Sequence, residues 1–182
     1  MMRTARLTLS NAITATRLLA VPFFYCAIVS EAWLPAFALF WLAVVTDVLD
    51  GRVARARGEV SAFGGLLDHA SDATFVSLGL IGLAMAGQVS FALPALVVAA
   101  FLQYVLDSRS LEGRTLRASF LGRWNGVLYF VPVGTIVTRE ALGLSWPGDG
   151  FVLGMGWLLV ITTLLSIVDR AWTLLSTRSD AG

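Results

Sequence analysis

Long apolar stretches separated by short polar segments follow one another along the whole chain. They predict six helices of membrane-spanning length, at about 11–30, 32–56, 64–87, 89–108, 122–142 and 151–176. Polar or glycine-containing breaks such as AGQ at 86–88 and SWPGDG at 145–150 separate them. Helices are favoured because a segment in lipid must satisfy its own backbone hydrogen bonds, and the connections here are short. The pattern therefore predicts an all-α, polytopic membrane protein with six transmembrane helices in one bundle.

Composition agrees with a membrane protein. Of the 182 residues, 57% are hydrophobic and 14% are charged, with a mean hydropathy of +0.79. An average soluble domain is about one quarter charged. Six spans use most of the chain, so we expect a single membrane domain over residues 1–182.

The charge balance excludes one class of partner. All 13 basic residues are arginines, and the formal net charge is only +1. A nucleic-acid-binding protein is expected to carry a basic tail or stripe, which this sequence lacks, so we expect no nucleic-acid partner.

The arginines also predict an orientation. They gather at alternate junctions between the spans, near residues 3–17, 52–57, 109–123 and 170–178. Only Arg139 falls at an opposite junction. By the positive-inside rule, both termini and the junction after residue 47 face the cytoplasm. We expect an integral protein of a bacterial or archaeal plasma membrane.

Four aspartates flank the junction between the second and third spans. Asp47 and Asp50 lie near the end of the second, and Asp68 and Asp72 lie near the start of the third. At 100° per residue, each pair falls on one face of its helix, within an arc of about 100°. The turn between the spans is short, so the two helices are antiparallel neighbours. We therefore expect the four carboxylates to converge on one polar cavity that opens to the cytoplasm.

Four unpaired anions at that depth would repel one another and lose part of their hydration. Nearby arginines could contribute to neutralising them, but a hard divalent cation suits an all-oxygen cluster better. Two ions about 3.5–4 Å apart could hold a pyrophosphate and stabilise charge on a phosphoryl group. The small residues Gly51, Ala54 and Gly64 leave open space beside the acids, where a ligand could approach the helix backbone.

The spacing of these residues carries a resemblance. The segments DVLDGRVAR at 47–55 and GGLLDHASD at 64–72 resemble the signature D-x2-D-G-x2-A-R-x8-G-x3-D-x3-D of the CDP-alcohol phosphatidyltransferases. Every specified position is occupied at the right interval. The segment NAITATRLLAVP at 11–22 is similar to the N-x2-T-x2-R pattern and later proline of that family's first helix, although Ser10 stands where many relatives have proline.

The resemblance implies a metal-dependent phosphotransferase of phospholipid biosynthesis. Members transfer a phosphatidyl, or another phosphoalcohol, group from a CDP-linked lipid donor such as CDP-diacylglycerol to an acceptor hydroxyl, and they release CMP. They require Mg²⁺ or Mn²⁺. Carried over by position, Asp47, Asp50 and Asp68 would bind metal, and Asp72 would bind or adjoin it and act as the catalytic base.

The resemblance also implies roles for the other motif positions. Gly51, Ala54 and Gly64 would line the site of the donor's cytidine, and Arg55 would help to hold the donor. Homodimerisation is expected from the family as well.

Two questions stay open at this stage. An intramembrane aspartate cluster could also serve a small membrane transporter or a proton or cation pathway, which cation-dependent CMP release would distinguish from an enzyme. The acceptor is the other question, and a polyol phosphate such as glycerol 3-phosphate or inositol phosphate is our hypothesis. Four polar residues on the acids' side could bind its phosphate, or could only anchor a loop to anionic head groups: Arg114, Arg117, Arg123 and Asn125.

Overall fold

The computed structural model describes residues 9–57, 62–110 and 120–179, and their regular structure is entirely helical. The helices are α1 (Leu9–Val29), α2 (Trp33–Arg57), α3 (Ala62–Met85), α4 (Ala92–Ser110), α5 (Phe120–Leu128), α6 (Phe130–Leu142) and α7 (Asp149–Ser179). The predicted all-α class is confirmed.

The fifth predicted helix, over 122–142, is two helices in the structure. The prediction of one continuous helix is wrong here, because a turn at Tyr129 separates α5 from α6. Pro132 gives the physical reason. It has no N–H for the carbonyl four residues earlier, and it is tolerated in the first turn of a helix, where α6 places it.

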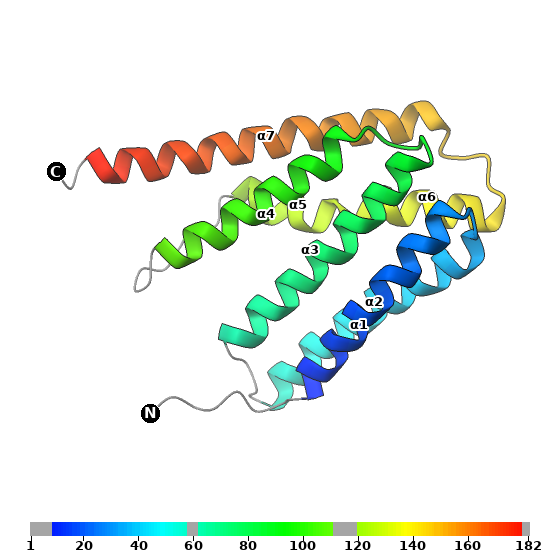
Figure 1. Ribbon diagram of the computed structural model, residues 1–182, viewed down its shortest axis with the longest axis horizontal. Helices are drawn as coiled ribbons and strands as arrows, with labels where there is room; N and C mark the ends of the chain where they lie inside the picture. The colour runs from blue at the N-terminus through cyan, green and yellow to red at the C-terminus, as the bar shows by residue number, and fades with distance from the viewer. Residues whose placement is uncertain (1–8, 58–61, 111–119, 180–182) are drawn as a thin grey trace.

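The helices run back and forth through one bundle (Figure 1). α1 packs against α2 and α3, α2 packs against α6, and the long α7 packs against α4 and α5. In Figure 1 the start of α1, the end of α2, the start of α3 and the end of α4 all lie toward the left of the bundle. The aspartate-bearing ends of α2 and α3 are therefore neighbours.

Aromatic side chains form the centre of the core. The rings of Phe24 and Phe75 stack with centroids 4.5 Å apart, and Phe40 and Phe130 pack around them. Phe75 is completely buried and lies three residues after Asp72 on α3. This rigid cluster supports the part of α3 that carries the acids.

Large apolar side chains also cover much of the surface, including Phe23, Leu34 and Trp172. In the described part of the chain, the segment Asp149–Thr173 is long and apolar enough to cross a bilayer, with a mean hydropathy of 2.3. Three other apolar helical segments are shorter: Thr14–Val29, Trp33–Leu49 and Ala92–Leu106. Length and composition thus identify one spanning helix among the described residues.

Candidate functional site

Three of the four predicted acids come together in space. Asp47 on α2 and Asp68 and Asp72 on α3 each offer a carboxylate oxygen, and these oxygens lie within 4.8 Å of one another. Asp68 and Asp72 share a helix face because they are four residues apart. Asp50 lies in α2, but its side chain is outside the described part of the structure. We call Asp47, Asp68 and Asp72 the aspartate triad.

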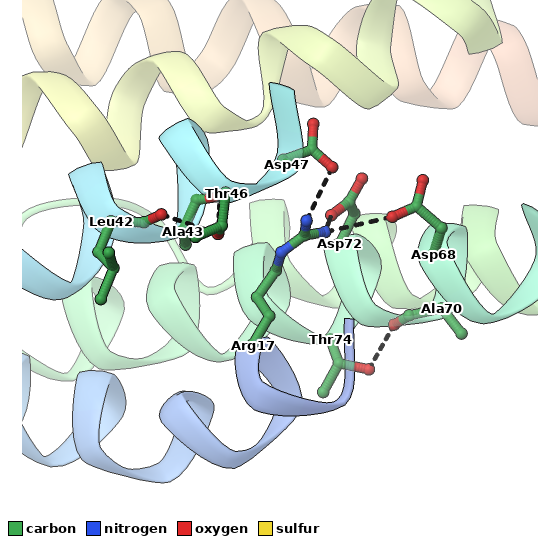
Figure 2. Close-up of polar contacts among 9 residues, drawn as sticks. All are labelled: Arg17, Leu42, Ala43, Thr46, Asp47, Asp68, Ala70, Asp72 and Thr74. Atoms are coloured by element: carbon green, nitrogen blue, oxygen red, sulfur yellow. Dashed lines mark hydrogen bonds and ion pairs between the residues drawn. The ribbon is translucent and has the colours of Figure 1, made fainter. Parts of the chain in front are cut away.

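Arg17 on α1 is placed against all three members of the triad (Figure 2). Its Nη1 donates to Oδ1 of Asp72 at 2.5 Å and to Oδ1 of Asp68 at 3.3 Å. Its Nη2 forms an ion pair with Oδ1 of Asp47 at 3.0 Å. One guanidinium thus joins α1, α2 and α3 through the three carboxylates.

The triad and Arg17 differ strongly in exposure. The Arg17 side chain is 2% exposed, whereas the side chains of Asp47, Asp68 and Asp72 are 43%, 45% and 28% exposed. Figure 2 shows the second oxygen of each carboxylate on the side away from Arg17. A ligand approaching from solvent therefore meets carboxylate oxygens before it meets the guanidinium.

This donor set fits a divalent metal ion. Among the ion pairs of the described residues, these three carboxylates share the single guanidinium of Arg17, so this group of four side chains keeps a net negative charge. Mg²⁺ and Mn²⁺ prefer oxygen ligands and suit clusters of carboxylates. The triad therefore has the chemistry and the spacing of a site for such an ion, with Asp50 as a further ligand expected from the sequence.

A cavity of about 510 Å³ opens beside the triad. Arg17, Asp47 and Asp72 line one part of it. Most of the remaining lining is apolar, from residues such as Val97 and Phe101 on α4. The cavity thus combines a charged end with an apolar wall, as a site for an amphipathic ligand requires.

A second polar group lines this cavity from other helices. Arg123 comes from α5, Arg170 from α7, and Gln103 and Tyr104 from α4. The Arg170 guanidinium carbon lies 5.1 Å from the centroid of the Tyr104 ring, and Gln103 Nε2 donates to the Ile167 carbonyl at 3.2 Å. These contacts hold α4 to α7 at the cavity, and they place cationic groups in the lining of the same cavity as Asp47 and Asp72.

The residues predicted for the acceptor fall in different places. Arg123 lines the cavity, but Asn125 is 2% exposed and is not part of the lining. Arg114 and Arg117 lie outside the described residues. Gly51, Ala54, Arg55 and Gly64 belong to α2 and α3, but beyond their place in these helices their surroundings lie outside the described part.

Arg170 and Tyr104 are cavity residues that the sequence analysis did not single out. Their signal is a charged or polar residue near the end of an apolar helix, which is a functional hint in membrane segments. His69 also lines the cavity, and its ring centroid lies 4.8 Å from that of Tyr104. Only the packing of α3, α4 and α7 shows that the three belong together.

Comparison with known proteins agrees with this site. The family model described as CDP-alcohol phosphatidyltransferase matches residues 7–168, which include the triad and Arg17. The chain belongs to this family. The resemblance inferred from the motif at 47–72 is thereby confirmed.

Curated members of the CDP-alcohol phosphatidyltransferase family show similar sequences over much of the chain. A probable phosphatidylglycerophosphate synthase of Mycobacterium tuberculosis is 31% identical, over 90% of this chain and 81% of the relative. A phosphatidylinositol phosphate synthase of Mycobacterium marinum is 30% identical, over 76% of this chain and 61% of the relative. The chloroplastic CDP-diacylglycerol–glycerol-3-phosphate 3-phosphatidyltransferase 1 of Oryza sativa is 35% identical, over 89% of this chain and 55% of the relative.

Proposed function

We propose that this protein transfers a phosphatidyl or related phosphoalcohol group from a CDP-linked lipid donor, such as CDP-diacylglycerol, to an acceptor hydroxyl in phospholipid biosynthesis. The observation that carries the proposal is the aspartate triad, two members of which line a largely apolar cavity, in a chain of this family. A charged end suits the diphosphate of the donor, and the apolar wall suits its lipid part.

The metal ligands are Asp47, Asp50, Asp68 and Asp72, which hold Mg²⁺ or Mn²⁺, with two ions as the expected number. Bound metal supplies positive charge that neutralises the donor's diphosphate and the CMP leaving group. Gly51, Ala54 and Gly64 admit the cytidine beside α2 and α3, and Arg55 binds the donor.

Asp72 is the catalytic base in this proposal. The acceptor oxygen attacks the phosphorus of the transferred group, and its proton passes to the Asp72 carboxylate. The bond from that phosphorus to CMP breaks, and CMP leaves with the bonding electrons. Asp72 lines the cavity and is held by Arg17, which fits the short reach that proton transfer requires.

The acceptor is a polyol phosphate such as glycerol 3-phosphate or inositol phosphate. Support comes from the cationic side of the cavity, where Arg123 and Arg170 can pair with a phosphate while the hydroxyl reaches Asp72. The names of several relatives include glycerol 3-phosphate, which belongs to this class of acceptor. Arg114, Arg117 and Asn125 complete the proposed phosphate-binding group.

The architecture in this proposal is one domain of six spans, with the termini and the active site in the cytoplasm of a bacterial or archaeal cell. The homodimer expected from the family is part of it. The distribution of the arginines and the apolar surface support the orientation and the membrane setting.

The test is CMP release by the purified full-length chain in lipid nanodiscs containing CDP-diacylglycerol. Acceptors are supplied one at a time: glycerol 3-phosphate, inositol phosphate, glycerol, inositol and serine. We expect release that depends on Mg²⁺ or Mn²⁺ and on one phosphorylated acceptor.

The matched variants are Asp68→Asn and Asp169→Asn, which remove one carboxylate each. Asp68 belongs to the triad, whereas Asp169 is exposed on α7 and does not line the cavity. Loss of CMP release in Asp68→Asn alone supports the transferase. No release with any acceptor, together with cation flux through proteoliposomes, would favour the transporter instead.

A further inference from the structure

We propose that Arg17 is a positioning residue for the metal site, which holds one oxygen of each triad carboxylate so that the other oxygen points away from the guanidinium, toward an incoming metal ion. This inference rests on the metal site in the proposed function. It concerns how the chain prepares that site before metal and donor bind.

The contacts of Arg17 are the first observation. Each of its contacts with the triad uses the same kind of atom, Oδ1 of Asp47, Asp68 or Asp72, at 2.5–3.3 Å. Figure 2 shows the other oxygens on the far side of the carboxylates. A guanidinium has several N–H groups in a fixed plane, so one arginine can orient several carboxylates at once.

The burial of Arg17 is the second observation. Its side chain is 2% exposed, and all three carboxylates are more exposed than it is. Arg17 is therefore the less accessible partner in each contact, and a cation arriving from solvent can reach the outward oxygens without displacing it. A buried arginine that competed with the metal would have to leave its pocket whenever metal bound.

Electrostatic repulsion explains why the site needs such a residue. Carboxylates with oxygens inside 4.8 Å of one another repel when no metal is present, and these three are exposed enough for that repulsion to turn them apart. Arg17 offsets that repulsion through its contacts with Oδ1 of each carboxylate, and these contacts limit how far the carboxylates can rotate. Groups that orient metal ligands in this way typically change metal affinity by about 10–100-fold when removed.

Whether metal affinity rises or falls when Arg17 is replaced distinguishes a positioning role from a purely electrostatic one. Removing a positive charge beside a cation site should tighten metal binding if only the electrostatic field matters. Removing a residue that orients the ligands should weaken it. Arg17→Gln therefore gives opposite results under the two explanations.

The experiment measures Mn²⁺ binding by electron paramagnetic resonance on the purified full-length chain in detergent, without donor or acceptor. We expect Arg17→Gln to weaken Mn²⁺ binding by about 10–100-fold. Arg17→Lys should weaken it as well, because an ammonium keeps the charge but lacks the planar set of donors. Arg123→Gln is the matched control: it removes the same charge from the cavity lining, on a helix other than those of Arg17 and the triad, and should leave Mn²⁺ binding equal or tighter.

Unchanged or tighter Mn²⁺ binding in Arg17→Gln would overturn the inference, and so would wild-type binding in Arg17→Lys. Circular dichroism and size-exclusion chromatography check folding, and if Arg17→Gln does not fold, Arg17→Lys decides. Equal binding in all variants, with CMP release intact, refutes only the role of Arg17. Absence of Mn²⁺ binding in the wild type refutes this inference together with the metal site of the proposed function.

Discussion

Gly79 on α3 lies directly against the ring of Phe24 on α1. A Cβ added at Gly79 would come within 2.8 Å of Phe24 Cε1, and within 3.3 Å of a methyl group of Val133. The Phe24 ring has little room to move, because it is completely buried and stacked on Phe75 at 4.5 Å. The absence of a side chain at Gly79 therefore lets α1 and α3 approach closely, which helps Arg17 on α1 to reach Asp68 and Asp72 on α3.

Gly79→Ala should destabilise the protein. Overpacking a filled core costs about 1–3 kcal/mol, of which the better helix propensity of alanine returns at most about 1 kcal/mol. Gly154→Ala on α7 is the control, because nothing lies within 4 Å of a Cβ built there. Thermal unfolding in detergent, followed by circular dichroism, should show a lower midpoint for Gly79→Ala and an equal or higher one for Gly154→Ala. Equal midpoints in both variants would contradict the close approach.

The helices and the acids were predictable from the sequence for a physical reason. Both depend on local periodicity: an apolar run predicts a helix, and residues four apart such as Asp68 and Asp72 share a face. Asp47 joins them because a short turn makes α2 and α3 neighbours. The break at Tyr129 has a local cause too, in Pro132, but an apolar pattern continues across it and conceals it.

The contacts of Arg17 and Arg170 were beyond sequence reasoning. Arg17 lies 51 residues before Asp68, and their contact depends on how α1 packs on α3. Arg170 reaches the cavity through the packing of α7 on α4. Helix contacts of this kind depend on how surfaces fit, as the Phe24 ring fits against Gly79. The periodicity of the sequence does not specify that fit.

Arg139 should be important for stability rather than for catalysis. It is 6% exposed, and it donates to the Pro147 carbonyl at 3.0 Å, to Asp149 at 2.7 Å and to Gln88 at 2.9 Å. It thereby joins the α3–α4 turn, the end of α6 and the start of α7. Hydrogen bonds to charged groups contribute about 1.5–3 kcal/mol each.

Arg139→Gln is expected to lower the free energy of unfolding by about 1.5–3 kcal/mol, since glutamine cannot replace all of these bonds. Thermal unfolding should show the loss, while CMP release per folded molecule stays at the wild-type rate. Arg52→Gln, at an exposed position of α2, should change stability by no more than about 0.5 kcal/mol. A matching loss in both variants would mean that charge, and not the Arg139 contacts, stabilises the fold.

Arg123→Gln and Arg170→Gln should weaken use of the acceptor more than use of the donor. Both arginines line the cavity on helices other than those of the triad, and each is proposed to pair with the acceptor's phosphate. Losing one charge-assisted contact of about 1.5–3 kcal/mol corresponds to roughly a 10–100-fold rise in acceptor KM. Steady-state kinetics that vary acceptor and donor separately measure the two constants. An equal rise in both KM values would place these arginines at the donor instead.

Asp72→Asn should abolish transfer while leaving the bundle folded, because asparagine has nearly the same shape and Arg17 keeps its contacts with Asp47 and Asp68. Removing a catalytic base lowers turnover by roughly 10²–10⁴-fold.

Asp72 is also a proposed metal ligand, so loss of activity alone does not identify the base. Raising the Mn²⁺ concentration separates the two roles, since it refills a weakened metal site but cannot restore a missing base. We therefore expect excess Mn²⁺ to recover CMP release in Asp68→Asn and not in Asp72→Asn. Recovery in Asp72→Asn would assign Asp72 to the metal alone, and another group would have to take the acceptor's proton.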